Sequence, residues 1–260
     1  MTARRFYGAR PPGITAEPLP GRLIVLEGVD GVGRSTQIAL LQEWLEHRGF
    51  AVIQTGLTRS MLAGRGIQRA KRGNTLDPIT LNLLYATDFW DRLERQIVPA
   101  LHAGMVALAD RYIFSLIARA RVRGLSGRWL RDLYDFALVP DRVLYLDIDI
   151  EQLLPRVLAG GGFDYWESGQ DYLRDPNLYQ NFTHYQSALL KEFRRLARAN
   201  RLTTIDARGS VSQVFTRLKA ELEGMLDDMA AEPRPAGPAL VLPAAARPQP
   251  PQRLRREQPV

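Results

Sequence analysis

The chain has 260 residues, which allows one domain of ordinary size with tails, or at most two small domains. It contains no cysteine and only three scattered histidines, which excludes a disulfide framework and a thiolate metal site. No apolar run reaches the length of a membrane span, and the N-terminal residues lack the apolar core of a secretory signal. We therefore expect no membrane segment and a cytoplasmic location.

The net charge of +7 is concentrated at the two ends of the chain. Residues 1–22 carry four arginines against one glutamate, and residues 231–260 carry five arginines against two acids. The segment between them is about neutral, so nucleic-acid binding by a folded core is not expected. Twelve of the 17 prolines also lie in these flanks. This composition predicts disorder in residues 1–21 and 229–260, on either side of one domain at residues 22–228.

Taken in chain order, short apolar runs alternate with amphipathic segments of helical period. The predicted strands are residues 23–26, 51–54, 105–109, 142–147 and 202–205. The main predicted helices are residues 35–49, 77 to about 103, 151–158, a long helix from residue 175, and residues 211–229, with shorter ones within 56–73 and between residues 112 and 142. Such alternation predicts an α/β fold of three layers, with helices on both faces of a parallel sheet.

The first strand and helix are joined by a glycine-rich turn in the segment RLIVLEGVDGVGRSTQ, residues 22–37. The spacing Gly28-x4-Gly33, followed by a cation and a hydroxyl, is typical of a phosphate-binding loop (P-loop). Backbone N–H groups and the N-terminus of the next helix bind phosphate oxygens in such loops, and the hydroxyl ligates Mg²⁺. The expected phosphate-binding residues are Gly28, Val29, Asp30, Gly31, Val32, Gly33, Arg34, Ser35 and Thr36.

Arg34 stands where this motif has lysine, and guanidinium is a planar fork whereas ammonium is a compact point charge. A glycine-rich turn that binds nothing is the simpler alternative, although the strand–turn–helix setting favours a phosphate site. Asp110 follows a second apolar run directly. A carboxylate at that point lies at the carboxyl edge of a parallel sheet, where open α/β folds bind ligands.

Three segments in order resemble the thymidylate kinases, a family of P-loop nucleoside monophosphate kinases: LIVLEGVDGVGRSTQ, LLYATDFWDRLERQIVPALHAGMVALADRYIFS and VPDRVLYLDID. The resemblance covers about residues 22–228. It implies a five-stranded parallel sheet with a mobile lid, and usually a homodimer. It also implies transfer of the γ-phosphoryl group of Mg·ATP to a nucleoside monophosphate, dTMP, giving dTDP.

By the same resemblance, Arg34, Asp110 and Arg111 would be catalytic, and Ser35 and Asp110 would lie at the Mg²⁺ ion. The acceptor would be bound by Asp30, Arg59, Tyr85 and Arg111. Simpler roles are open for some of them, because Asp110 can cap a helix, Tyr85 can be plain core and Arg59 can be a solvated turn residue.

The chain departs from the family at residues that read the base and at the lid. Residues 87–90 are TDFW where the family commonly has ADR or NRW, with an arginine that reads thymine, and residues 118–121 are ARAR where it often has AYQG. The lid, residues 157–173, contains no basic residue, and Gly31 lacks the arginine that some members place there. The remaining candidate cations for the transferred group are Arg34, Arg156, Arg119 and Arg121.

The leading hypothesis is a kinase that phosphorylates a nucleoside monophosphate, dTMP in the first place. One alternative is a nucleotide-binding regulatory protein of the same fold that has lost catalysis, which Arg34 and the acid-rich lid motivate. Another is a kinase for a different phosphorylated acceptor, since the departures at residues 87–90 and 118–121 affect base reading.

Overall fold

The computed structural model describes residues 5–14, 19–73, 76–173 and 176–231. Five parallel strands form one sheet in the order β2-β3-β1-β4-β5. The strands are β1 (Arg22–Glu27), β2 (Val52–Gly56), β3 (Val106–Asp110), β4 (Arg142–Asp147) and β5 (Thr203–Asp206). The predicted α/β fold with a five-stranded parallel sheet is therefore confirmed, and each strand begins within one residue of its predicted start.

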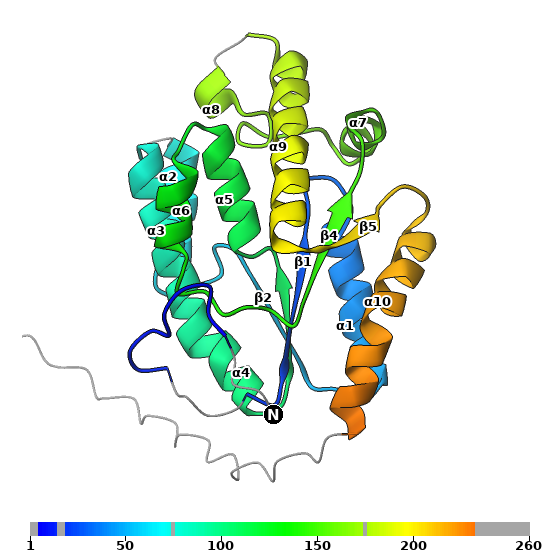
Figure 1. Ribbon diagram of the computed structural model, residues 1–260. Helices are drawn as coiled ribbons and strands as arrows, with labels where there is room; N and C mark the ends of the chain where they lie inside the picture. Colours follow the sequence, from blue (N-terminus) through cyan, green and yellow to red (C-terminus); the bar gives the residue numbers. More distant parts are fainter. Residues whose placement is uncertain (1–4, 15–18, 74–75, 174–175, 232–260) are drawn as a thin grey trace, which may run out of the picture.

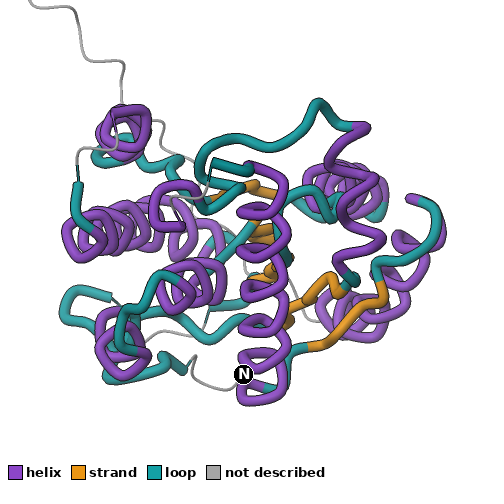
Figure 2. Tube along the Cα trace, turned by 90° about the horizontal axis from the view of Figure 1, so that it is seen from above, coloured by secondary structure: helices purple, strands orange, loops and turns teal. Residues whose placement is uncertain are grey.

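Helices cover both faces of the sheet (Figures 1 and 2). They are α1 (Arg34–His47), α2 (Gly64–Gly73), α3 (Pro78–Arg92), η1 (Leu93–Ile97), α4 (Val98–His102), α5 (Ile113–Val122), α6 (Gly127–Leu133), α7 (Ile150–Ala159), α8 (Gln170–Leu173), α9 (Leu178–Asn200) and α10 (Val211–Ala231). The segments α3, η1 and α4 run on from one another where the sequence predicts a single helix. The π-helical turn η1 ends just before Pro99, which has no N–H to donate to the preceding turn.

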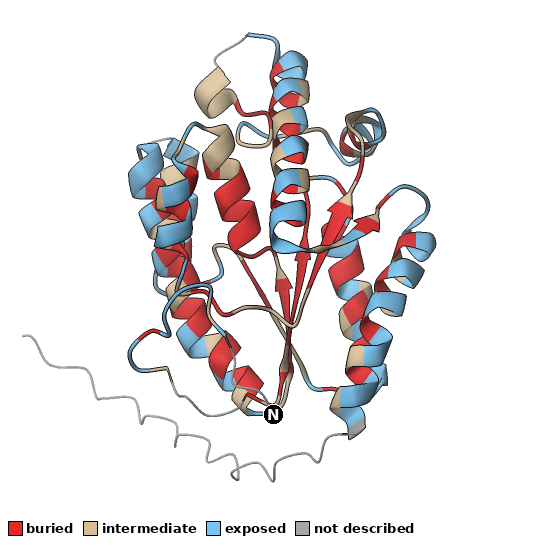
Figure 3. Ribbon diagram, viewed as in Figure 1, coloured by how far each residue is buried: buried red, intermediate tan, exposed pale blue. Residues whose placement is uncertain are grey.

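The core lies between the sheet and the two helical layers. Leu23, Ile24, Val25 and Leu26 are fully buried, because β1 is the central strand and packs against helices on both faces. In Figure 3 the buried residues follow the strands and the sides of the helices that face them. The apolar run that predicted a doubly covered strand is thus the middle of the core.

The parallel arrangement brings three loops to one edge of the sheet. Leu26 of β1 and Gly56 of β2 both pair with Asp110 of β3, so these strands end at the same level. The turn to α1, the loop that follows β2 and the turn to α5 therefore start side by side. This edge faces the segments around α7 and α8 at the top of Figure 1.

Part of the N-terminal flank packs on the domain, which corrects the expected disorder for residues 5–8. Tyr7 N donates to Ala137 O at 3.0 Å, and Val139 N donates to Arg5 O at 2.8 Å. The Tyr7 ring also meets Phe114 edge to face, with centroids 6.1 Å apart. Two aromatic side chains thus offset the polar composition that predicted disorder. Residues 1–4, 15–18 and 232–260 lie outside the described part, and α10 continues past the expected boundary at 229.

Within the described ranges, no helix combines the length and the apolar character that a membrane span requires.

Candidate nucleotide-binding and phosphoryl-transfer site

The turn between β1 and α1 has the geometry of an anion-binding loop. Gly28, Gly31 and Gly33 have φ angles of 152°, 78° and 98°, which side chains with a Cβ rarely adopt. Gly33 caps α1 with no side-chain hydrogen bond to the helix amides, and Ser35 is exposed in the first turn. The first N–H groups of this 14-residue helix therefore have no side-chain acceptor, which suits a phosphate group.

The residues also fit a nucleotide-bound Mg²⁺ ion. Ser35 offers an exposed hydroxyl, and the Asp110 side chain at the end of β3 is 16% exposed. Across the described residues, no three His, Cys, Asp or Glu side chains gather in a way that could hold a metal ion. Magnesium accepts such a sparse site, because it commonly keeps several water ligands and takes one or two protein ligands beside phosphate oxygens.

The Arg34 side chain folds back over the loop that it follows. Its Nε donates to Asp110 Oδ1 at 2.7 Å, and its Nη1 donates to Gly28 O at 2.7 Å and Val29 O at 2.8 Å. A guanidinium can hold these acceptors at once because its donors form a fixed planar fork. The cation of the phosphate loop is thus buried and held at the junction between the loop and β3.

Asp30, in the middle of the loop, pairs with two arginines. Arg111 lies in the turn before α5, and Arg119 lies on α5. Asp30 Oδ1 accepts from Arg111 Nη2, and Asp30 Oδ2 accepts from Arg119 Nη2 at 2.5 Å. Burial alone would raise the pKa of Asp30, but the charges of Arg111, Arg119 and Arg34 outweigh it and hold the pKa well below its ordinary value of 3.8. The carboxylate is therefore ionised at neutral pH and joins the phosphate loop to the arginines.

Arg111 has a left-handed backbone with φ of 74°, which is uncommon for a residue other than glycine. Its N–H donates to Leu26 O at 3.0 Å, and its Nη1 donates to Gly28 O and Ser115 Oγ, both at 3.2 Å. Burial, followed by repulsion from Arg119 and Arg34, lowers the pKa of Arg111. These contacts hold a strained backbone and a buried cation in one orientation, a feature that clusters at functional sites.

Glu27 is a site residue that the sequence reasoning missed. It is fully buried at the end of β1 and accepts from Tyr112 N at 2.8 Å, Ser115 N at 3.1 Å and Ser115 Oγ at 2.5 Å. Burial raises its pKa, and the hydrogen bonds and Arg111 oppose that rise. The carboxylate fixes the turn on which Arg111 lies. The sequence did contain a signal for Glu27. It is the same signal that indicated Asp110, an acidic residue at the end of an apolar run.

Arg59 lies on the loop after β2, at the same edge of the sheet. A Cβ at Gly56 would lie 3.3 Å from Arg59 Nε and 3.0 Å from Asp110 O, so its guanidinium lies over the ends of β2 and β3. The loop is fixed by Asp88 of α3, whose buried carboxylate accepts from Thr58 N at 3.1 Å and Ser60 N at 3.0 Å. Arg59 is exposed, and it forms no ion pair with a carboxylate of the described residues.

Tyr85 is half-buried on α3 and lines a small cavity of about 40 Å³. Burial, the largest effect, raises the pKa of its hydroxyl. The other lining residues are Lys71, Leu81, Asn82, Leu116, Arg119, Ala120, Arg123 and Trp166. In contrast, Phe89, one turn further along α3, is fully buried against Tyr112 with ring centroids 4.9 Å apart.

The three further candidate cations lie in different places. Arg119 reaches Asp30, and Arg156 of α7 extends over the loops with Nη2 3.1 Å from Gly209 O and Nη1 3.5 Å from Val32 O. Arg121 instead pairs with Glu192 of α9 at 2.7 Å. The expectation that Arg121 could serve the transferred group is therefore wrong, because its side chain is committed to helix packing.

Comparison with known proteins gives the family. The thymidylate kinase family model matches residues 26–218. A probable thymidylate kinase 2 of Saccharolobus solfataricus is 35% identical over 210 residues, which cover 80% of this chain and 98% of that protein. A thymidylate kinase of a Synechococcus strain is 32% identical over 219 residues, covering 82% and 99%. Together with the phosphate loop and the arginines around it, these matches show that the chain belongs to the thymidylate kinase family.

Proposed function

We propose that the protein phosphorylates dTMP to dTDP with ATP as the phosphate donor. The observation that carries the proposal is the meeting of Arg34, Arg111, Asp30 and Asp110 at one sheet edge, next to the uncapped N-terminus of α1. Phosphoryl transfer depends mostly on positioning and on stabilising charge, and this edge provides fixed cations on both sides of the loop. The relatives of similar length, named as thymidylate kinases, support dTMP as the acceptor.

On the donor side, the loop amides and Ser35 would hold the triphosphate, and Arg34 would neutralise the charge of the transferred group. A bound Mg²⁺ ion would bridge phosphate oxygens and withdraw charge from them. Ser35 and Asp110 are the residues placed to hold that ion. Arg156, which lies over the loop beside Gly209, is a second cation available to the donor.

On the acceptor side, Arg111 and Arg59 would clamp the phosphate, since both lie at the ends of strands that pair with one another. Two arginines on one dianion orient it for in-line attack and reduce its repulsion with the incoming phosphate. Asp30 would accept from a sugar hydroxyl, and Tyr85 would contact the base. ATP and nucleoside monophosphates are cytoplasmic metabolites, which fits the cytoplasmic location expected from the sequence.

We also propose that the protein forms a homodimer through the outer face of α3. Ile79 and Leu83 are 50% and 47% exposed one turn apart on this helix, so a second copy packed on this face would remove both apolar side chains from water. Light scattering after gel filtration tests this, with Leu83→Glu expected to give monomers and Leu158→Glu, on α7, as the control. A monomeric wild-type protein would refute the dimer.

Coupled assays with dTMP, dUMP, dCMP, dGMP and AMP test the proposed reaction. We expect the highest kcat/KM with dTMP, and no turnover without Mg²⁺. Calorimetric binding of ATP together with no turnover of any of the five acceptors would contradict the proposal and favour a regulatory nucleotide-binding protein.

A further inference from the structure

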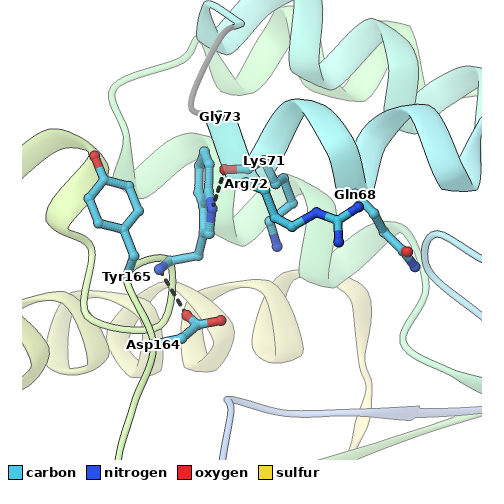
Figure 4. A pocket seen from close by; sticks show the side chains of 7 residues that line it. Gln68, Lys71, Arg72, Gly73, Asp164 and Tyr165 are labelled. Atoms are coloured by element: carbon cyan, nitrogen blue, oxygen red, sulfur yellow. Dashed lines mark hydrogen bonds between the residues drawn. The ribbon is translucent and has the colours of Figure 1, made fainter.

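The N-terminal flank reaches the neighbourhood of the proposed acceptor clamp. One pocket of the described part, of about 600 Å³, lies between α2 and the lid residues Asp164 and Tyr165 (Figure 4). Another, of about 470 Å³, lies between α5, α6 and α9, and Tyr7 of the flank is one of its lining residues. Phe114, in the first turn of α5, lines the same pocket. This turn begins two residues after Arg111, so the flank lies beside the segment that carries the clamp.

Residues 5–8, which we call the N-terminal strap, pair with the segment that follows α6. Phe6 forms an antiparallel bridge with Leu138. Three backbone hydrogen bonds of 2.6, 2.8 and 3.0 Å join the strap to residues 135–139. The strap is part of the dark blue segment in Figure 1. The family model begins its match at residue 26, so the strap lies outside the residues that this model describes.

The strap also contacts the first turn of α5 through a pair of aromatic rings. The Tyr7 ring meets Phe114 edge to face, at an interplanar angle of 87°. Phe114 is buried, whereas Tyr7 keeps 39% of its surface exposed. Burial raises the pKa of Tyr7 to about 12, and the negative charge of Glu27 adds to the rise. Tyr7 thus covers Phe114 from the solvent side and lies within electrostatic reach of the carboxylate that fixes the turn.

The residue before α5 is held by the segment that the strap covers. Tyr112 Oη donates to Leu138 O at 2.7 Å, and Leu138 is the residue that pairs with Phe6. On the other side, Glu27 accepts from the N–H groups of Tyr112 and Ser115. The turn is therefore held between a buried carboxylate and the segment beneath the strap.

This support matters because the backbone of Arg111 is strained. A left-handed conformation, with φ of 74° here, persists in a residue with a Cβ only where the surrounding contacts enforce it. The guanidinium of Arg111 also donates to Ser115 Oγ at 3.2 Å, and Ser115 directly follows Phe114. A movement of Phe114 would therefore move Ser115 and the arginine that it holds.

We propose that Tyr7 is a positioning residue for Arg111: its ring holds Phe114 in place, and the first turn of α5 then holds the guanidinium that clamps the acceptor phosphate. This rests on the proposed kinase function and adds a segment outside the family match to the support of the acceptor site. Tyr7 contacts no reacting atom in this role. Because the ring makes the contact, phenylalanine can replace tyrosine, whereas alanine cannot.

The test measures kcat/KM for dTMP, and KM for ATP, in wild type, Tyr7→Ala and Tyr7→Phe. An edge-to-face pair contributes an energy that corresponds to about threefold to tenfold in an equilibrium constant, so kcat/KM for dTMP should fall by about that factor in Tyr7→Ala. The KM for ATP should not change, because Phe114 supports the turn before α5 and not the N-terminus of α1. Tyr7→Phe should behave as wild type.

A double-mutant cycle shows whether Tyr7 acts through Arg111. In an Arg111→Ala background, Tyr7→Ala should cause little further loss, because the residue that it positions is gone. The matched control is Phe215→Ala, which removes one ring of another edge-to-face pair. Phe215 of α10 meets Trp44 of α1 with ring centroids 6.5 Å apart. This variant should keep the wild-type kcat/KM for dTMP.

Hydrogen exchange gives a readout that does not depend on turnover. The N–H groups of Tyr112 and Ser115 bind Glu27, and local opening of the turn would expose them to solvent. They should exchange faster in Tyr7→Ala than in wild type, and at the wild-type rate in Phe215→Ala. Unchanged exchange in Tyr7→Ala would overturn the inference.

The outcomes separate this inference from the proposed function. No turnover of dTMP by the wild-type protein would refute the kinase function and the acceptor-binding role of Arg111 with it, while hydrogen exchange would still show whether the strap holds the turn. Turnover of dTMP with an unchanged kcat/KM in Tyr7→Ala would overturn the positioning role and leave the kinase function standing. A loss that adds in full to that of Arg111→Ala would also overturn it, and so would an equal loss in Tyr7→Phe.

Discussion

Arg34 Nε donates to Asp110 Oδ1 at 2.7 Å, which joins the first residue of α1 to the last residue of β3. Both side chains are largely buried, so their charges neutralise one another. The same two groups are the ones expected to face the transferred phosphate and the metal ion. When a nucleotide binds, its phosphate must therefore either share Arg34 with Asp110 or replace Asp110 as the partner of Arg34. The planar arrangement of the guanidinium donors decides how easily this happens.

Replacing Arg34 tests whether arginine has taken over the role of the missing lysine. Arg34→Ala should reduce kcat/KM by about a hundredfold or more, the usual effect of losing a fixed charge contact to the transition state. Arg34→Lys should also reduce it, since an ammonium cannot reach Asp110, Gly28 and Val29 together. Steady-state kinetics with dTMP measure both, with circular dichroism as the folding control. A gain in turnover with lysine would instead indicate a degenerate site.

The site was predictable from sequence where its signal is local. The loop Gly28–Ser35 and the acid Asp110 stand next to apolar runs, so strand, turn and edge could be inferred together. The pairing of Asp30 with Arg119 joins residues 89 apart in the chain, and no local pattern reveals it. The packing of Tyr7 on Phe114 was hidden for the same reason, because the composition of a segment does not show which surface it meets.

Arg111 should matter more than Arg59 for acceptor turnover. Arg111 is held by Asp30, Gly28 O and Ser115, whereas Arg59 is exposed on a loop. A preorganised contact loses more on removal than one that must order first. Arg111→Ala should lower kcat/KM about a hundredfold or more, and Arg59→Ala by a smaller factor. The measurement is kcat/KM for dTMP in both variants, and equal small effects would contradict the assigned acceptor clamp.

Asp30 gives the folded state a defined pH dependence. Because its pKa is lowered in the folded protein, its contribution is fully present above the ordinary value of 3.8 and is lost as pH falls through the lower folded value. Asp30→Asn leaves Arg111 and Arg119 facing one another, so it should lower the free energy of unfolding by about 3 kcal/mol at pH 7. This difference should shrink below about pH 4, as the ordinary pKa of an aspartate sets.

Urea unfolding of wild type and Asp30→Asn between pH 3 and 7 measures that difference. The matched control is Asp206→Asn, since Asp206 also has a lowered pKa but pairs with Arg208 on the surface. Solvent screening weakens an exposed pair, so the control should show a much smaller loss at every pH. A difference for Asp30→Asn that grows as the pH falls would show that the sign of the linkage is wrong.

Trp166 should report acceptor binding directly, because its indole lines the cavity beside Tyr85, the residue proposed to contact the base. The chain has four tryptophans, so replacing Trp44, Trp90 and Trp129 by phenylalanine leaves Trp166 as the sole indole fluorophore. We expect its emission to change on addition of dTMP and to saturate at the affinity that calorimetry gives, because a base bound in this cavity changes the surroundings of the ring. The converse variant, Trp166→Phe with the other three tryptophans kept, should show little change. Calorimetric binding of dTMP without any change in Trp166 emission would mean that the base binds away from this cavity.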